Sequence, residues 1–484
     1  MRAILRNLLV AALALAATQA AAQENERATK SPDRTACGSP KPDDAIRGCS
    51  HILQDKGLPN GDRAIALRDR GVAFQNKGDL AHAIADYDAA IGLGESAAGN
   101  ATVFAKTHVN RGIAYAAKGD DARALNNYAA AIALDPRVGV AYLNRAAISL
   151  KRGDKAAALA DLSEAVRLSP KDAAAVVSRG ALYANAGDYA HAIADFSAAI
   201  ALNPADANAW RNRGITYRKT GDAARAAADA AEALRLEPNL NGAHRDRALA
   251  LAANGDAETA IGEFGRAIAL NPTDAETIKA RGDAYLARNQ HDLAIADYSR
   301  AIGLDPDFRD AYNNRGAAYI AKADWDHAIP DLGRVIELDP SLAAAYFNRG
   351  QAFEAKSARA HAIADFDKVI QLTPDAQSAW RHRGFLRHAN GDYAGAAADY
   401  AKAVALDPKD QEAWRGKGAT ELDARKTDAA IADLTQAIAL NDKDALAYRF
   451  RSQAYGMKKD MRHAVEDDEA AIRLDPKLAQ RAPR

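Results

Sequence analysis

Apolar and small residues recur along this chain with a period of 34 residues. Nine prolines from Pro136 to Pro408 follow one another at that interval, and Pro476 stands two intervals further on. With these prolines assigned to repeat position 32, twelve copies of one motif cover residues 64–97 and then, without a gap, 105–478. Within each copy, positions 4, 8 and 11 share one helical face, and positions 20, 24 and 27 share another. The pattern predicts two helices per copy.

The residue types at these positions indicate a tight helical hairpin. Position 20 is alanine in all twelve copies, position 8 is Gly, Ala or Ser, and positions 11 and 24 are often aromatic. Seven copies carry Gly-Asp between the helices, as at Gly119-Asp120. Glycine permits the left-handed turn that ends the first helix, aspartate caps the second, and Pro at position 32 prevents that helix from continuing. Aromatic residues make up only 6% of the chain, so we expect packing through small side chains.

This pattern resembles the tetratricopeptide repeat (TPR) family. The small position 8, the aromatic positions 11 and 24, Ala at 20, Ala or Val at 27 and Pro at 32 carry the resemblance through twelve copies. The resemblance implies an all-α fold, a right-handed superhelical α-solenoid of about twelve 34-residue helix-turn-helix repeats. It also implies a concave groove, lined by the first helix of each pair, that commonly binds a peptide or a partner protein.

The N-terminal segments predict export and capping. Residues 1–22 have a basic start, an apolar run and a small-residue end, which is typical of a signal peptide and predicts a periplasmic or secreted protein. Cys37 and Cys49 are the only cysteines, and in an exported chain they favour one disulfide. They lie in an N-terminal segment, residues 23–63, where Ala45, Cys49 and Ile52 repeat the spacing of a second helix. We interpret this segment as a capping half-repeat.

The array, residues 64–478, departs from regularity in three places. The joint between the first two copies is longer, and residues 98–104 are interpreted as a surface insertion, with a binding loop as the alternative. Arg387 and Glu421 replace the aromatic residue at position 11 of neighbouring copies, and we expect an ion pair between them. Asp468 and Glu469 predict that the last helix is its own polar cap, followed by a C-terminal tail at residues 479–484.

Charge and motif content argue against nucleic acid and against catalysis. The 64 Lys and Arg balance 64 Asp and Glu, whereas phosphate recognition needs a basic surplus. No phosphate-binding loop, nucleophile elbow or metalloprotease motif is present. Position 7 is basic in all copies and position 23 is acidic in eleven, which predicts a structural ladder of pairs such as Arg213 with Asp229. We expect no enzyme activity, no cofactor, no nucleic-acid partner and no transmembrane segment.

Histidines raise the alternative of a metal site. Five of the eleven take position 19, on the outward side of the second helix, where successive copies are too far apart to share an ion. His382 and His388 lie together on one first helix, beside Arg381 and Arg387. We expect no metal there either.

The exposed face of the first helix, positions 2, 5, 6, 9, 12 and 13, is the best candidate for function. Asparagine recurs at position 6, and the resemblance implies a role for this row, because some family members use groove asparagines to hydrogen-bond the backbone of an extended peptide. A solvated helix residue or a bond to the neighbouring repeat explains the asparagines equally well. Position 5 changes from apolar to basic along the chain, which predicts an apolar groove first and a basic groove later, suited to a segment with apolar and acidic residues. The candidate groove residues are Asn110, Asn144, Asn212, Asn314, Asn348, Val109, Leu143, Arg211, Arg245, Arg381 and Arg415.

The sequence therefore favours an exported, non-enzymatic protein–protein interaction scaffold of the bacterial envelope, which binds a partner protein or extended peptide in its groove. One alternative is a structural component of an envelope assembly, such as polysaccharide export or cell-wall machinery, that uses its convex face or its ends. A carbohydrate-related enzyme is disfavoured, because no segment outside the repeats is large enough for a catalytic domain. The sequence leaves the partner and the oligomeric state open.

Overall fold

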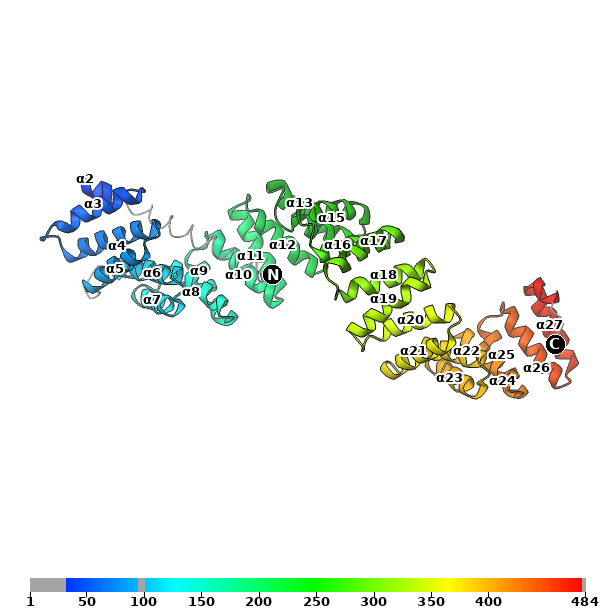
Figure 1. The fold of residues 1–484 in the computed structure, drawn as a ribbon. Helices are drawn as coiled ribbons and strands as arrows, with labels where there is room; N and C mark the ends of the chain where they lie inside the picture. Colours follow the sequence, from blue (N-terminus) through cyan, green and yellow to red (C-terminus); the bar gives the residue numbers. More distant parts are fainter. Residues whose placement is uncertain (1–31, 95–100, 481–484) are drawn as a thin grey trace. The chain divides into compact units, whose positions relative to one another are not determined.

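Paired α-helices make up the regular structure of this chain. The computed structural model describes residues 32–94 and 101–480, and none of these residues lies in a strand (Figure 1). The predicted signal peptide, residues 1–22, and the end of the predicted tail fall outside the described residues. The predicted all-α solenoid of about twelve helix-turn-helix repeats is confirmed.

Each repeat contributes a first and a second helix. The first helices are α4 (Asn60–Asn76), α6 (Ala101–Ala117), α8 (Gly139–Lys151), α10 (Ala173–Ala186), α12 (Ala207–Lys219), α14 (Ala243–Ala253), α16 (Ala275–Ala287), α18 (Arg309–Ala321), α20 (Ala343–Ala355), α22 (Gln377–Ala389), α24 (Gln411–Asp423) and α26 (Ala445–Met457). The second helices are α5 (Leu80–Gly92), α7 (Asp121–Leu134), α9 (Lys155–Leu168), α11 (Tyr189–Leu202), α13 (Ala223–Leu236), α15 (Ala257–Leu270), α17 (His291–Leu304), α19 (Trp325–Leu338), α21 (Arg359–Leu372), α23 (Tyr393–Leu406), α25 (Thr427–Leu440) and α27 (Met461–Leu474). Helices α2 (Pro32–Cys37) and α3 (Pro42–Gln54) precede the array, and a 3-10 helix, η2 (Pro476–Gln480), follows it.

The helices fall into two compact units. The N-terminal unit, Met1–Asn254, ends with α14, and the C-terminal unit, Gly255–Arg484, begins with α15. Inside each unit, a first helix packs against the second helix of its own repeat, and that second helix packs against the first helix of the next repeat. The core of each unit is therefore a continuous series of helix-to-helix contacts.

The joint inside each hairpin follows from its residues. Gly119 takes the left-handed conformation, with φ of 83°, and the Asp120 side chain then accepts a hydrogen bond from the backbone N–H of Arg123 at 2.9 Å. Five other repeats place a residue with a side chain in the same left-handed position, and Ala323 is one of them, with φ of 56°. The turn is thus imposed by the packing of the hairpin as well as by glycine.

Small residues let the two helices of a hairpin approach closely. The ring of Tyr128 lies over Gly112, where an added Cβ would come within 2.5 Å of the ring. Tyr128 and Ala124, both on the second helix, are completely buried. An alanine-rich core with few aromatic rings is therefore sufficient, because each ring fills a site that a glycine leaves open.

The predicted ladder of position 7 and position 23 is confirmed. Arg213 donates from Nε and Nη2 to the two carboxylate oxygens of Asp229 at 2.8 and 2.9 Å, and this bond raises the pKa of Arg213 above its ordinary value. The corresponding contact is present in eleven repeats. Arg213 also donates from Nη1 to Ser197 Oγ of the preceding repeat at 3.0 Å. The ladder therefore joins neighbouring repeats as well as the helices of one hairpin.

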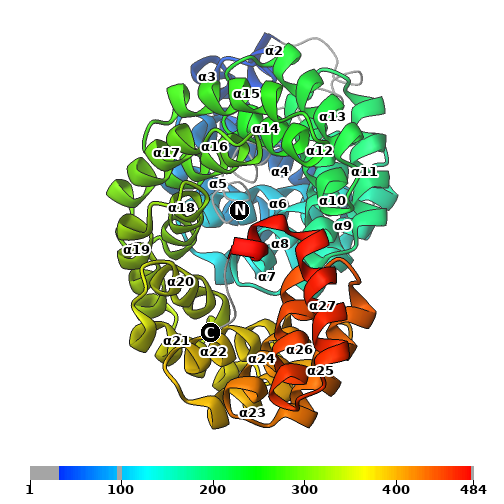
Figure 2. The same cartoon turned by 90° about the vertical axis from the view of Figure 1, so that its right-hand side faces the viewer.

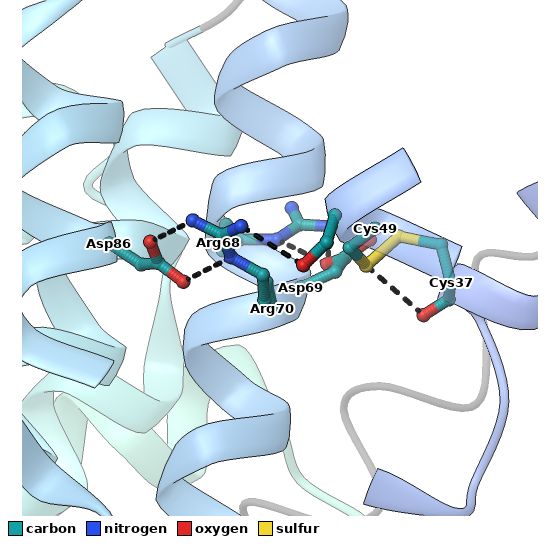
Figure 3. Close-up of a disulfide and its surroundings, with 7 residues drawn as sticks. Cys37, Cys49, Arg68, Asp69, Arg70 and Asp86 are labelled. Atoms are coloured by element: carbon teal, nitrogen blue, oxygen red, sulfur yellow. Dashed lines mark hydrogen bonds and ion pairs between the residues drawn. A yellow bond between two sulfur atoms is a disulfide. The ribbon is translucent and has the colours of Figure 1, made fainter. Parts of the chain in front are cut away.

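The predicted disulfide between Cys37 and Cys49 is present and joins α2 to α3 (Figure 3). Both cysteines are buried, Cys49 completely. The disulfide holds α2 against α3, which in turn packs on the first helix of the array.

Helix α3 occupies the position of a second helix ahead of the first repeat. Arg70 donates to Ser50 Oγ on α3 at 3.1 Å, as the ladder arginines do to the preceding repeat elsewhere. Lys77 forms an ion pair with Asp43 on α3 at 2.6 Å, the counterpart of the pair between repeats seven and eight. Both contacts place α3 in register with the array.

The boundary of the predicted insertion, residues 98–104, needs correction. Helix α6 begins at Ala101, so residues 101–104 add a turn to the first helix of repeat two rather than belonging to a loop. Phe104 on that turn is buried against Ala64, Leu67 and Ala90. The apolar contact of Phe104 explains why this helix starts early.

The last helix is less polar than predicted. Met461 and Val465 on α27 are 63% and 53% exposed, while Asp468 forms an ion pair with Arg449. In earlier repeats the residue at the position of Val465 is covered by the next first helix, and α27 has no such neighbour. Glu469 is exposed, as the polar-cap prediction requires, but the exposed Met461 and Val465 leave part of the helix surface apolar.

Candidate functional site

The first helices line the inner side of each unit. Consecutive first helices contact one another, as α12 does with α14 and α16 with α18, more extensively than consecutive second helices do. Each unit therefore curves toward its first helices; in the C-terminal unit α18 and α20 lie inside α17 and α19 (Figure 2). We call positions 2, 5, 6, 9, 12 and 13 of the first helices the inner face.

The five candidate asparagines do not form one uniform row. Asn144 is buried and donates from Nδ2 to the Val140 carbonyl of its own helix at 2.9 Å. Asn314 donates from Nδ2 to Asp283 of the preceding repeat at 2.8 Å. The remaining three are half-buried, and in the described part of the chain their side chains form no hydrogen bond: Asn110, Asn212 and Asn348.

The apolar candidates are largely part of the core. Val109 is only 3% exposed and packs with Tyr128 and Ile148. Leu143 is half-buried and packs on the cluster around Leu162. At position 9 of the same unit, Ile113 and Ala181 are half-buried and pack on the clusters around Tyr128 and Phe196, and Ile215 and Leu249 are half-buried as well.

The predicted basic stretch along the later repeats is neutralised. Arg381 forms ion pairs with Asp410, at 3.4 Å, and with Glu412, and Arg415 pairs with Asp444 at 3.0 Å. These carboxylates come from helix starts that follow the arginines in the chain. The sequence expectation of a basic groove in the later repeats is therefore wrong.

Arg211 and Arg245, the candidates in the N-terminal unit, are also engaged. Arg211 donates from Nε to Asp246 of the next repeat at 2.6 Å, and both side chains are less than a tenth exposed. Arg245 is half-buried on α14 and also has an interaction partner. Neither guanidinium is freely available to a partner.

The basic excess lies on the inner face of the N-terminal unit. The two acidic residues there, Asp69 and Asp246, are both in ion pairs, with Arg68 and Arg211. The basic residues on the same face are Arg68, Lys106, Lys151, Arg211, Arg218, Lys219 and Arg245. On the inner face of the C-terminal unit, acidic residues instead outnumber basic ones.

Arg218 and Lys219 are the residues that sequence reasoning missed. They end α12, whose sequence contains four basic residues and no acidic one, ANAWRNRGITYRK. That composition is the signal that could have identified them. The pattern at position 5 does not include these residues, because they occupy positions 12 and 13.

The predicted ion pair between Arg387 and Glu421 is absent. Arg387 donates from Nη1 to Asp399 of its own repeat at 3.0 Å. Glu421 faces Asp433 of its own repeat, and burial, followed by the hydrogen bond with Asp433, raises the pKa of Glu421 to about 7. Position 11 thus faces the second helix of the same hairpin rather than the neighbouring repeat.

Most of the histidines have structural partners, whereas the Nδ1 of His291 is buried without a hydrogen-bond partner among the described residues. His82, for example, stacks on Phe74 with ring centroids 5.1 Å apart and donates from Nδ1 to the Asp79 carboxylate at 2.6 Å. Residues 32–94 and 101–480 contain no group of three His, Cys, Asp or Glu side chains that could hold a metal ion. Over the same residues, no helix has the length and apolar character needed to cross a bilayer.

Comparison with protein families identifies the repeat in several parts of the chain. A model described as TPR repeat matches residues 180–221 and 282–322. Two models described as tetratricopeptide repeat match residues 207–240 and 377–410, and residues 109–173, 318–377 and 416–479. Together the matches cover more than half of the chain. A search of the curated proteins finds no match.

Several solved structures are similar to parts or most of this chain. YrrB, described as a TPR protein with an unusual peptide-binding site, is 21% identical over 38% of this chain and 95% of its own, with a TM-score of 0.36. The Cut9–Hcn1 complex of the APC/C is 16% identical over 91% of this chain and 99% of that chain, with a TM-score of 0.37. Yeast Tom70 is 19% identical over 87% and 99%, with a TM-score of 0.33. A fold of this repeat type supports a protein–protein interaction scaffold.

Proposed function

The chain belongs to the tetratricopeptide repeat family, and from that premise we propose that it is an exported, non-enzymatic scaffold that holds an extended segment of a partner protein. The segment lies against the inner face of the first helices in the N-terminal unit. One observation carries the proposal: this face combines half-buried apolar residues at position 9 with a basic excess that its own two acidic residues do not balance. Lys151 on this face pairs with Asp121 on α7, whereas the side chains of Arg218 and Lys219 form no ion pair or hydrogen bond with any residue that the structure describes.

The mechanism is binding without turnover. Ion pairs of the ladder fix the first helices relative to their own second helices and to the preceding repeat, so the inner face exists before the partner arrives. A preformed surface lowers the conformational cost of capturing an extended chain. The partner segment loses its freedom, whereas the scaffold loses little.

Export rests on two independent features. Residues 1–22 have the three regions of a signal peptide. The Cys37–Cys49 disulfide supports the same conclusion, because disulfides persist in oxidising compartments such as the periplasm. Cell fractionation should find the mature chain outside the cytoplasm, with both cysteines resistant to alkylation until they are reduced.

A matched pair of variants tests the binding surface. Ile215→Gln with Leu249→Gln changes two half-buried residues of the inner face, and Leu202→Gln with Leu270→Gln changes two exposed residues that end second helices. Partners captured by the wild-type chain from a periplasmic extract are identified by mass spectrometry and quantified with each variant. The inner-face variant should lose the partner while its helical circular dichroism is unchanged, and the second-helix variant should keep it. Loss only with the second-helix variant would contradict the proposal.

The envelope-assembly alternative depends on a different surface. It requires contacts through the ends or the second helices, and the exposed Met461 and Val465 on α27 are the residues that favour it. Under this alternative, Met461→Gln with Val465→Gln would abolish partner capture, while the inner-face variant would not.

A further inference from the structure

The basic side chains of the inner face differ in whether they have a partner. Lys106 and Arg245 have interaction partners, and the other engaged residues form ion pairs with carboxylates: Arg68, Lys151, Arg211, Lys279, Arg381, Arg415 and Arg449. Arg218 and Lys219 are the exceptions. Neither forms a side-chain hydrogen bond or an ion pair with any residue that the structure describes, and the Nε of Arg218 is buried without an acceptor.

The neighbouring repeat explains why Arg218 has no partner. Elsewhere, a polar residue at position 12 is satisfied by the next repeat: His388 contacts Thr420 Oγ1 at 2.7 Å and Asp423 Oδ2 at 2.9 Å, which occupy positions 10 and 13. After Arg218, those two positions are Ala250 and Ala253. Alanine side chains, which cannot accept a hydrogen bond, therefore stand where Thr420 and Asp423 supply acceptors to His388.

A second possible acceptor for Arg218, the residue at position 6 of the next repeat, already accepts a hydrogen bond from another arginine. Glu354 at position 12 bonds His382 at position 6 of the next repeat, at 2.8 Å. The position 6 residue that follows Arg218 is Asp246, and Asp246 accepts from Arg211 at 2.6 Å. The carboxylate at the equivalent of the His382 position is thus engaged by Arg211, and Arg218 forms no ion pair with any residue that the structure describes.

Burial makes this arrangement unfavourable in the free protein. A half-buried guanidinium has lost part of its hydration, and a buried N–H without an acceptor is destabilising. The last turn of α12 attracts positive charge through the helix dipole, and the exposed Lys219 satisfies that preference fully. The dipole therefore accounts for a positive charge at this end of α12 but not for a half-buried guanidinium whose Nε has no acceptor.

We propose that Arg218 and Lys219 bind the carboxylates of an acidic, apolar-flanked segment of a partner protein. The inference rests on the proposed function and names the chemistry of its partner. Ile215 lies one turn before Arg218 on the same face, and Leu249 lies on the next first helix, so apolar side chains beside the acidic residue find contacts. The acidic residues of this face, Asp69 and Asp246, are both paired, so they do not repel an incoming carboxylate.

Labelled synthetic peptides test the proposal on the mature chain by fluorescence anisotropy. One peptide alternates Glu with Leu, a second replaces every Glu by Gln, and a third replaces every Leu by Ser. The Glu–Leu peptide should bind at least tenfold more tightly than the other two, and added salt should weaken its binding.

Two variants with the same loss of charge locate the site. Arg218→Gln with Lys219→Gln should reduce the affinity for the Glu–Leu peptide about tenfold, the effect expected for losing a charge-assisted hydrogen bond. Arg152→Gln with Lys155→Gln, two exposed residues off the inner face of the same unit, should leave the affinity unchanged. Circular dichroism checks that both variants keep their helices.

The outcomes separate this inference from the scaffold proposal. Equal binding of the Glu–Leu and Gln–Leu peptides, equal effects of the two charge variants, or no peptide binding at all would overturn the carboxylate site. The scaffold proposal would survive each of these results as long as Ile215→Gln with Leu249→Gln still removes the natural partner. If every inner-face variant still binds both the Glu–Leu peptide and the natural partner, the carboxylate site and the scaffold proposal are both overturned.

Discussion

Repeat eleven carries a buried pair of carboxyl groups whose energetics the structure makes testable. In repeat ten, Arg383 holds both carboxylate oxygens of Asp399, at 2.9 and 2.6 Å. In repeat eleven, Lys417 takes the place of the arginine and reaches only Asp433 Oδ1, at 3.0 Å. The other oxygen of Asp433 and the Oε2 of Glu421 are buried without another donor. A proton on Glu421 is therefore required to join the two groups.

Burial and the charge of Asp433 raise the pKa of Glu421 from 4.5 to about 7. A carboxyl group with a raised pKa binds its proton more tightly in the folded chain than in the unfolded chain. Its contribution to stability is present in full below pH 4.5 and is lost as the pH rises through about 7. This difference corresponds to a loss of roughly 3 kcal/mol at most between those limits.

Glu421→Gln removes the titration and retains a donor, because the amide N–H₂ can donate to Asp433 without carrying charge. At pH 8 we expect the variant to be more stable than the wild type by about 1 to 3 kcal/mol, and at pH 5 we expect the two to be nearly equal. Glu469→Gln, an exposed substitution on α27, is the matched control and should have no effect that depends on pH in this range.

Hydrogen exchange is the appropriate assay, because a repeat array opens locally and need not unfold in one step. The exchange of α24 and α25 is compared between wild type and Glu421→Gln at the same pH, so that intrinsic exchange rates cancel. The stabilisation should grow between pH 5 and pH 8 and be confined to repeat eleven and its neighbours. A stability difference that is the same at both pH values would refute the proton shared by Glu421 and Asp433.

Two further substitutions test the backbone and the core. Ala323→Gly should raise the thermal stability of the chain by about 1 kcal/mol, because Ala323 has φ of 56° and glycine adopts that conformation without a Cβ penalty; an unchanged melting curve would contradict the strain. Gly112→Ala should destabilise by about 1 to 3 kcal/mol, since the new Cβ would lie 2.5 Å from the fixed ring of Tyr128. Gly262→Ala, with open space around the same atom, should instead stabilise its helix in the same measurement.

Contacts inside one hairpin could be predicted from the sequence. Positions 7 and 23 lie at the same height on antiparallel helices, so the pair of Arg213 and Asp229 follows from the repeat alone. The disulfide was also predictable, because Cys37 and Cys49 have no competing cysteine. In both cases the partners are close in sequence or have no alternative.

Contacts between repeats could not be predicted with the same success. The ion pair predicted between Arg387 and Glu421 required side chains at equivalent positions of adjacent repeats to meet. In the structure, position 11 faces the second helix of its own repeat instead. The basic groove failed for a related reason: Arg381 is paired with Asp410 and Glu412. Which carboxylate meets which arginine depends on the offset between stacked repeats, and one sequence does not define that offset.

The same limit applies to Arg218. The sequence gives the charge of Arg218, and only the structure shows that its Nε is buried without a partner and that Asp246 of the next repeat is bonded to Arg211. The equal numbers of basic and acidic residues in the whole chain do not reveal the basic excess on the inner face of the N-terminal unit.

Site-specific photo-crosslinking in the exported protein tests the central claim most directly. A photoreactive amino acid is placed at Ile215 on the inner face of the N-terminal unit or at Leu202, 40% exposed at the end of α11. The account predicts a covalent adduct with a partner protein from residue 215 and none from residue 202. An adduct from residue 202 alone would contradict it and would assign the contact to another surface.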